Sequence, residues 1–353
     1  MAVVDSFEYL FREISLVCRS TRDALAFLGA LYASRKTFQF IGCVLKAGND
    51  HLLSKLSRWS NLQKRFGKWA VVTGSSEGIG RAYARELASR GLNIVLISKK
   101  ENRLYRTAKD IEEKFGVQTC VIGINFNEGR EIYQEIWEAI KDKEIGILVN
   151  NVGVTYDYPQ PFLEVPTEML WQLINVNVAT ATMMTHMILP QMVERCKGAV
   201  VMVSAGSCDK ITPLTTVYSA TKRTFRQVPK YFAKQYEYQD FLDYWRIVVQ
   251  SLMPFYVATR MTRFSETLSR PSIMIPSAAD YARHAIATLG YTSRTTGYWP
   301  HTLQGWIIQC IPDSLWMWGA TRLNYAFKRQ TDERIKRRSL RLMHSDQSQE
   351  SDS

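Results

Sequence analysis

The sequence predicts an α/β protein built on a doubly wound parallel sheet that helices cover on both faces. Between residues 67 and 300, short continuous apolar runs alternate with helical stretches, which is typical of strands buried on both sides. A glycine-rich turn follows the first of these runs, and polar motifs follow later ones. The 353 residues leave room for one such domain with additional segments at both ends.

The domain is expected to contain six strands separated by helices. The strands are expected at residues 69–73, 93–98, 119–125, 146–150, 198–204 and 246–253. The helices are expected at residues 80–90, 101–115, 128–140, 167–195 and 218–236. A doubly wound sheet of parallel strands places its ligand crevice at the carboxyl ends of those strands.

The segment before the domain, residues 1–66, is expected to form a helical leader. Its apolar runs at 24–33 and 38–45 are each too short to span a bilayer. The leader can be an interfacial or re-entrant helix in contact with a membrane, or a helix packed on the domain. Three acidic residues among the first thirteen argue against a signal or transit peptide.

Two further segments lie in the carboxyl-terminal part of the chain. Residues 260–276 are polar and interrupted by prolines, which favours a lid over a substrate. Residues 301–330 are expected to form an aromatic extension, which can pack in a core or, beside a basic tail, lie at a membrane surface. Residues 331–353 are expected to be a disordered charged tail.

Charge and cysteine content exclude some classes of function. The formal net charge is +12, and basic residues cluster just before and after the domain, where they are solvated or contact an anionic membrane. No nucleic-acid-binding motif accompanies them, so no nucleic-acid partner is expected. The six cysteines form no CxxC pair and no metal-binding spacing with histidine, so we expect a reducing compartment and no metal site.

The glycine-rich turn TGSSEGIG, from Thr73 to Gly80, is typical of a dinucleotide-binding loop in a Rossmann-type domain. Gly74 permits the turn, Gly78 lets the backbone approach phosphate, and Gly80 allows a helix to pack closely on the strand. The helix that follows presents its N-terminus to the pyrophosphate. The cofactor contacts expected from this loop are Gly74, Ser75, Ser76, Gly78, Ile79 and Gly80.

The end of the second strand distinguishes between the two nicotinamide dinucleotides. An acidic residue there would bind the ribose 2′-hydroxyl, but the chain has Ser98, Lys99 and Lys100, and Arg81 follows the glycines. Lys99 is the best candidate to pair with a 2′-phosphate, so NADP(H) is the expected cofactor. The alternative is that both lysines are ordinary surface residues.

Two later motifs complete the expected site. The run from Asn150 to Gly153 ends the fourth strand, where Asn151 can tie strand ends and Gly153 can leave room for the adenosine ribose, although a simple turn would look the same. Tyr218 and Lys222 lie four residues apart on one side of a helix. The lysine charge can lower the tyrosine pKa from about 10 and create a proton donor for a carbonyl group.

These motifs, in this order and spacing, resemble those of the short-chain dehydrogenase/reductase family over about residues 67–300. Within the family the chain is similar to the branch that holds 17β-hydroxysteroid dehydrogenases and very-long-chain 3-oxoacyl-CoA reductase. Its amino-terminal runs 4–7 and 12–14, with 254–259, look closest to an inactive, mitochondrial group of that branch. The resemblance implies a mitochondrial location, or the endoplasmic reticulum membrane as the alternative, and a homodimer formed through two long helices.

The resemblance also implies a role for each matching residue. Tyr218 would be the general acid, and Lys222 would lower its pKa and hold the nicotinamide ribose. Asn177 would position a water that relays protons to Lys222. Val257 and Thr259 would contact the cofactor near its carboxamide or phosphates.

Two of the departures from the family pattern concern the expected site. The serine expected thirteen residues before the tyrosine is Ala205, and the loss of such a hydrogen-bond donor typically costs about 10²–10³ in rate. Ser204 would face the opposite side of its strand, and Ser207 could reach the site only if its loop moved. Asn125 replaces the acid that usually contacts adenine, which would weaken that contact.

Two functions therefore remain open from the sequence. The first is an NADP(H)-dependent oxidoreductase of hydrophobic carbonyl or alcohol substrates, of the hydroxysteroid or 3-oxoacyl class, impaired by Ala205. The second is a catalytically inactive, cofactor-binding protein that acts as a scaffold or sensor.

Overall fold

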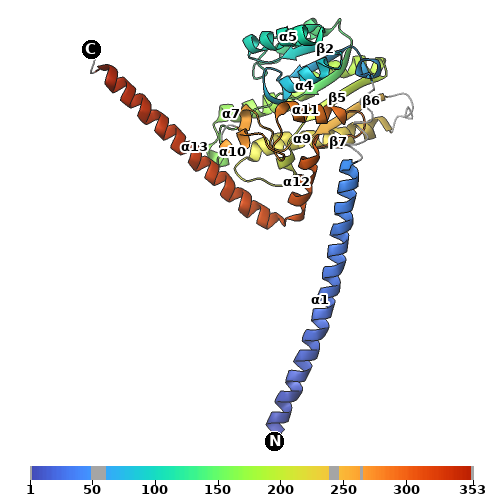
Figure 1. Ribbon diagram of the computed structural model, residues 1–353, viewed down its shortest axis with the longest axis vertical. Helices are drawn as coiled ribbons and strands as arrows, with labels where there is room; N and C mark the ends of the chain where they lie inside the picture. Colours follow the sequence, from blue (N-terminus) through green and yellow to red (C-terminus); the bar gives the residue numbers. More distant parts are fainter. Residues whose placement is uncertain (1, 49–60, 238–245, 263–264, 351–353) are drawn as a thin grey trace. The chain divides into compact units, whose positions relative to one another are not determined.

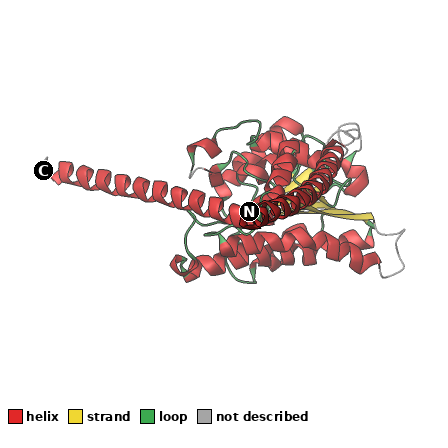
Figure 2. Cartoon of the chain, turned by 90° about the horizontal axis from the view of Figure 1, so that it is seen from below, coloured by secondary structure: helices red, strands yellow, loops and turns green. Residues whose placement is uncertain are grey.

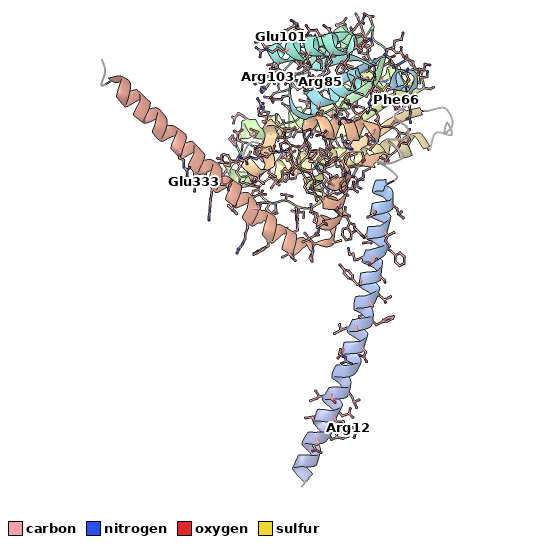
Figure 3. All side chains as sticks on the ribbon, in the orientation of Figure 1. Arg12, Phe66, Arg85, Glu101, Arg103 and Glu333 are labelled. Carbon is pink, nitrogen blue, oxygen red and sulfur yellow. The ribbon has the colours of Figure 1, made fainter. Side chains whose placement is uncertain are left out.

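The computed structural model describes residues 2–48, 61–237, 246–262 and 265–350, and the chain divides into two compact units, Met1–Gly48 and Asn49–Ser353. The first unit is a single helix, α1 (Ala2–Gly48), whose described side chains stand out on all sides (Figure 3). Its described apolar side chains are exposed, Phe27 and Phe38 among them. Within the described ranges, none of the helices has the length and apolar character that crossing a bilayer requires.

The second unit is built on a parallel sheet whose strand order, within the described residues, is β3-β2-β1-β4-β5-β6-β7 (Figure 1). The order reverses between β1 and β4, so the crevice of a doubly wound fold lies at their carboxyl ends. The strands are β1 (Trp69–Thr73), β2 (Asn93–Ile97), β3 (Thr119–Ile122), β4 (Ile145–Asn150), β5 (Lys197–Val203), β6 (Arg246–Leu252) and β7 (Arg294–Thr295). The six expected strands are confirmed, and the two-residue β7 is an addition.

Helices cover both faces of the sheet, as Figure 2 shows. Successive residues of a strand point to opposite faces, so Ala70 and Val72 of β1 join one apolar cluster and Val71 joins the other. The first face packs against α4 (Gly78–Ala88), α5 (Glu101–Phe115) and α11 (Ala278–Ala287). The second face packs against α6 (Ile132–Ile140), α8 (Thr180–Glu194) and α9 (Thr216–Glu237).

Helix α5 illustrates how local sequence sets these elements. Its buried residues Leu104, Ala108 and Ile111 recur at helical spacing and form one apolar face. The helix ends at Gly116, which has a φ of 65° that glycine adopts without strain. The bounds expected from the sequence, 101–115, are confirmed.

The long helix expected at 167–195 is interrupted. It consists of α7 (Thr167–Ile174), a π-helical turn η3 (Asn175–Ala179) and α8. The expectation of one continuous helix is therefore wrong. The hydroxyl of Thr180 donates to the carbonyl oxygen of Asn175, 3.0 Å away, which fits the wider π geometry.

The domain extends beyond both expected boundaries. The short helix α3 (Leu62–Phe66) buries Leu62 and Phe66 in the core, so the domain begins before residue 67. Helix α12 (Trp299–Cys310) buries His301 completely, so the extension after residue 300 is partly domain core. The segment between β6 and α11 contains two short helical turns, η5 (Arg260–Thr262) and α10 (Glu266–Ser269).

The expected disordered tail is instead helical over its described part. Helix α13 (Asp313–Glu350) continues through residues 331–350. These residues include four arginines, one lysine and two glutamates, which favour helices, and Arg337 pairs with Glu333 one turn earlier.

Candidate cofactor and redox site

The glycine-rich loop between β1 and α4 is closely packed. A Cβ atom on Gly80 would lie 2.4 Å from the carbonyl oxygen of Gly74 and 2.4 Å from Nδ2 of Asn151. Gly74 and Gly78 have φ values of 69° and 60°. Helix α4 begins at Gly78, where a Cβ atom would lie 3.6 Å from the side chain of Thr259, and the N-terminus of such a helix suits the pyrophosphate of a dinucleotide.

The serines of the loop connect it to β2. The hydroxyl of Ser98 donates to the hydroxyl of Ser76 at 3.0 Å, and the backbone N–H of Ser75 donates to the carbonyl oxygen of Ile97 at 3.3 Å. All three serines are buried, while Ile79 packs against the core. Their contacts therefore fix the backbone of the loop.

A cluster of charges lies beside the loop. The carboxylate of Glu77 pairs with Arg103 and Arg260, both at 2.5 Å, and with Lys100 at 3.5 Å. Burial lowers the pKa of Lys100, an effect that the Glu77 carboxylate opposes. Arg103 extends from the start of α5 in Figure 3, and Lys99 is exposed to solvent outside this cluster.

Sequence reasoning missed Glu77, Arg103 and Arg260. Lys100 and Arg103 are three residues apart at the start of a helix, a spacing that places them on one face. From that spacing the sequence could have predicted that Lys100 and Arg103 form a basic pair beside the loop.

The polar residues at the end of β4 tie neighbouring strands together. Nδ2 of Asn151 donates to the carbonyl oxygen of Thr73 at 2.9 Å, and the backbone N–H of Asn151 donates to the hydroxyl of Thr73 at 3.0 Å. A Cβ atom on Gly153 would lie 2.8 Å from Nζ of Lys222 and 3.3 Å from Oδ1 of Asn177. Gly153 thus leaves space where these two expected site residues meet.

Asn177 is held rigidly within the π-helical turn. Its Oδ1 accepts from the backbone N–H of Val154 at 2.8 Å, and its Nδ2 donates to the carbonyl oxygen of Val154 at 3.0 Å. The same Nδ2 also lies 3.1 Å from the hydroxyl of Thr221 on α9. These contacts join the helix that carries Asn177 to the helix that carries Lys222.

The pKa of Tyr218 is not set as the sequence predicts. Lys222 is 6% exposed, and burial lowers its pKa to about 8, partly opposed by Cys208. Burial raises the Tyr218 pKa well above its usual range, and Cys208 and Tyr256 raise it further. The expectation that Lys222 lowers this pKa is wrong for this arrangement, because burial dominates and Lys222 directs its Nζ to the carbonyl oxygen of Val203.

Ala205 stands at the end of β5, 9% exposed, where a hydroxyl donor was expected. The hydroxyl of the neighbouring Ser204 donates to the backbone carbonyl oxygen of Lys222 on α9, so it is already engaged. The side chain of Ser207 lies outside the described side chains. Cys208, which the sequence reasoning did not select, is buried and interacts electrostatically with both Tyr218 and Lys222.

The turn after Ala205, η4 (Gly206–Asp209), is anchored by ion pairs. The carboxylate of Asp209 lies 2.8 Å from Nη1 of Arg226 on α9 and 3.6 Å from Nη2 of Arg294 on β7. The backbone N–H of Cys208 donates to the carbonyl oxygen of Ala205 at 3.2 Å. These contacts connect the turn that follows Ala205 to α9 and to the edge of the sheet.

The remaining expected contacts lie at the borders of the crevice. Nδ2 of Asn125 donates to Oε1 of Glu128 at 3.0 Å, so its amide is engaged in its own turn. Val257 is buried in the core, and the backbone N–H of Thr259 donates to the hydroxyl of Thr262 at 3.2 Å.

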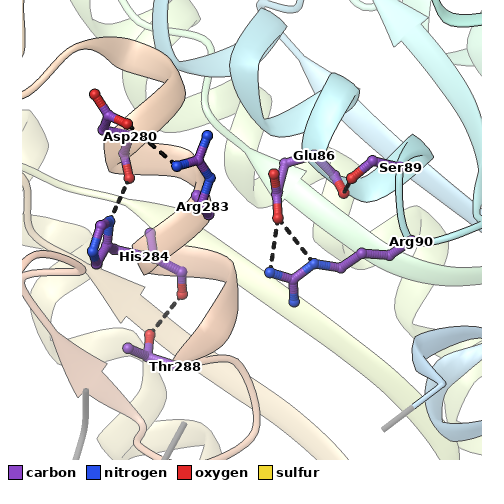
Figure 4. A network of polar contacts seen from close by, with 8 residues as sticks. Glu86, Ser89, Arg90, Asp280, Arg283, His284 and Thr288 are labelled. Atoms are coloured by element: carbon purple, nitrogen blue, oxygen red, sulfur yellow. Dashed lines mark hydrogen bonds and ion pairs between the residues drawn. The ribbon is translucent and has the colours of Figure 1, made fainter. Parts of the chain in front are cut away.

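A groove of about 510 Å³ adjoins the outer side of Gly78 and Thr259, between α4 and α11. Figure 4 shows two ion pairs of these helices, Glu86 with Arg90 and Asp280 with Arg283. The groove borders the glycine-rich loop, and neither Tyr218 nor Lys222 lines it.

Known proteins match this chain along most of its length. The chain is 49% identical over 330 residues to "Inactive hydroxysteroid dehydrogenase-like protein 1" of Homo sapiens, covering 94% of this chain and 98% of that protein. It is 38% identical over 322 residues to "Very-long-chain 3-oxoacyl-CoA reductase" of Anas platyrhynchos, covering 89% and 94%.

A solved structure shares the fold. A short-chain dehydrogenase from Sphingobium yanoikuyae, solved in complex with NADPH, is 22% identical with a TM-score of 0.54, covering 62% of this chain and 83% of that one. The family model described as short chain dehydrogenase matches residues 68–268. With the parallel sheet, the glycine-rich loop and this match over more than half of its length, the chain belongs to the short-chain dehydrogenase family.

Proposed function

We propose that the protein binds NADP(H) at the carboxyl ends of β1 and β4 and reduces hydrophobic carbonyl substrates slowly. The observation that carries this proposal is the meeting of Lys222 and Asn177 at Gly153, on the same side of the sheet as the glycine-rich loop. Tyr218 lies one helical turn before Lys222 on α9. The chain thus retains Asn177, Tyr218 and Lys222, and it lacks the serine hydroxyl whose position Ala205 occupies.

The preference for NADP(H) over NAD(H) rests on the charges around Glu77. Lys100, Arg103 and Arg260 bring three positive charges to one carboxylate, which leaves the cluster with a net positive charge. A 2′-phosphate carries more negative charge than a carboxylate and offers three acceptor oxygens, so it suits several cations at once.

The chain's own residues would handle the proton. The cofactor supplies the hydride when it is bound. Tyr218 is protonated at neutral pH and can donate to the substrate oxygen, but the burial that raises its pKa makes it a weaker acid, which also favours slow turnover. Ala205 offers that oxygen no hydrogen bond, so one stabilising donor is missing and turnover is expected to be slow.

The exposed side chains of the segment after β6 favour an apolar substrate. Tyr256, Met261, Ile273 and Met274 all follow β6, and their side chains are exposed. Such a surface suits a steroid or a 3-oxoacyl thioester better than a small polar ketone.

A second copy of the chain is proposed to cover the exposed Trp171, Ile174 and Met183 of α7 and α8, which would make a homodimer.

A second candidate is a cofactor-binding protein without turnover. Ala205 favours it, and the human relative carries the word inactive in its name. Such a protein would act as a sensor, because binding of NADP(H) would change its stability or its conformation.

The test measures binding and turnover separately. NADPH should raise the melting temperature of the purified full chain more than NADH does, and an unchanged temperature with both would overturn both candidates. Oxidation of NADPH with a panel of steroid ketones and 3-oxoacyl-CoA thioesters should be slow, and Tyr218→Phe should abolish it. Cofactor binding with no oxidation above the Tyr218→Phe background would favour the second candidate.

A further inference from the structure

The first half of α13 docks on the domain through one face. Nε1 of Trp316 donates to the carbonyl oxygen of Ile211 at 3.2 Å, and Nδ2 of Asn324 donates to the carbonyl oxygen of Pro213 at 2.7 Å. Ala320, midway between them, is buried. These residues recur every four positions, so they form one stripe of the helix.

The opposite stripe alternates aromatic rings and guanidinium groups. Trp318 and Tyr325 are 57% and 44% exposed, and Arg322 and Arg329 are exposed beside them. At 3.6 residues per turn, these four positions lie about half a turn from the docked stripe. Cζ of Arg322 lies 4.5 Å from the centre of the Trp318 ring, so the cation stacks on the aromatic face.

We propose that this outer stripe, Trp318, Arg322, Tyr325 and Arg329, binds the surface of an anionic lipid bilayer with α13 lying parallel to it. Tryptophan and tyrosine favour the interface between headgroups and acyl chains, and arginine beside them reaches lipid phosphates. Residues 318–342 contain eight basic and two acidic residues, so the attraction to anionic headgroups extends along the helix.

The charges argue against a second copy of the chain as the occupant. In a two-fold symmetric contact the same stripe faces itself, which would bring Arg322 and Arg329 close to the arginines of the other copy. Asp332 and Glu333, which follow Arg329 along α13, already interact with Lys328 and Arg337 of the same helix. An anionic lipid surface offers the opposite charge without that repulsion.

The test is flotation of the full chain with phosphatidylcholine vesicles, with and without phosphatidylserine. The wild type should float with the phosphatidylserine vesicles and not with phosphatidylcholine alone. Trp318→Ala with Tyr325→Ala should weaken binding about 10-fold, as should Arg322→Gln with Arg329→Gln, because both insertion and charge contribute. The matched control is Tyr105→Ala with Arg106→Gln on α5, where Tyr105 is 56% exposed, and it should bind as the wild type does.

Four results would overturn the proposal. The wild type could fail to bind either vesicle, or bind both equally. The α13 variants could bind as well as the wild type, which would assign any membrane contact to another segment. The α13 variants could keep vesicle binding and lose a dimer in sedimentation analysis, which would make the stripe a subunit interface. Melting temperatures close to that of the wild type would show that the variants are folded.

Discussion

Nζ of Lys222 donates a hydrogen bond to the carbonyl oxygen of Val203 at a distance of 3.1 Å. The ammonium group thereby lies at the end of β5, two residues before Ala205. Burial of this charge is costly, and its pKa falls from 10.5 to about 8. The fold therefore maintains a buried lysine that its stability alone would not favour.

Replacing Lys222 with methionine should stabilise the protein near neutral pH. The unfolded chain keeps this lysine protonated up to about pH 10.5 and the folded chain only up to about 8, so the unfolded state binds more protons between these values. Stability attributable to this group therefore rises with pH across that window, and the cost of burying the charge is fully present below pH 8. Allowing for the lost hydrogen bond, Lys222→Met should raise the free energy of unfolding at pH 7 by about 1–3 kcal/mol.

Urea unfolding at pH 7 and pH 10 would measure this effect. The advantage of the variant should shrink at the higher pH, because the wild-type lysine is then largely neutral. The same variant should lose the thermal shift with NADPH if Lys222 holds the nicotinamide ribose. If Lys222→Met lowered the free energy of unfolding at pH 7, burial would not be the dominant influence on the pKa of Lys222.

Ala205→Ser should increase carbonyl reduction by roughly 10²-fold. The serine hydroxyl would supply the hydrogen bond that the developing oxyanion lacks, and the surrounding turn is already fixed by Asp209. The measurement is the rate of NADPH oxidation with the best ketone of the panel, with Ser204→Ala as a comparison because that hydroxyl faces α9. If Ala205→Ser binds NADPH and stays inactive, more than one part of the site has lost its function.

Much of the sheet could be predicted because its strands are short continuous apolar runs that alternate with amphipathic helices. Val71, Val95 and Leu148 are fully buried, so burial alone specifies their segments. The π-helical turn at Asn177 could not be predicted, since neighbouring residues give no break in the helical pattern. The direction of the Lys222 side chain was also beyond the sequence, because its Nζ donates to the carbonyl oxygen of Val203, and only the fold brings β5 and α9 together.

The charge cluster shows a second limit of sequence reasoning. Glu77, Arg103 and Arg260 come from three segments that are distant along the chain, and only the fold brings them together. The sequence identified the right region of the site and favoured Lys99 as its phosphate partner. The residue that lies in the cluster is its neighbour Lys100.

Glu77→Gln should increase selectivity for NADP(H) over NAD(H) by about 10-fold. The substitution removes the carboxylate that competes for Lys100, Arg103 and Arg260, and it keeps the size of the side chain. Glu77 makes no side-chain capping bond to α4, so the helix start should be unaffected. Dissociation constants of NADPH and NADH, measured by fluorescence at low and high salt, would test this.

The matched control for this charge is Asp110→Asn. Asp110 pairs with Arg85, away from the glycine-rich loop, and should leave the cofactor preference unchanged. Higher salt should reduce the gain of Glu77→Gln, because the attraction between the freed cations and the phosphate is screened. Equal weakening of both cofactors by Glu77→Gln would show that the carboxylate only shapes the loop.

Gly80→Ala should destabilise the domain by about 2–4 kcal/mol and abolish the thermal shift with NADPH. The new methyl group would meet the backbone oxygen of Gly74 at 2.4 Å, and neither the strand end nor α4 can retreat without disturbing the loop. Gly319→Ala on α13 is the control, because a methyl group there meets nothing within 4 Å and should stabilise its helix by about 0.5–1 kcal/mol. Thermal and urea unfolding of both variants would separate a packing clash from helix propensity, which alone would stabilise both. The same methyl group would also meet Nδ2 of Asn151 at 2.4 Å. A stable Gly80→Ala protein that still binds NADPH would therefore mean that the loop holds the cofactor without this close packing.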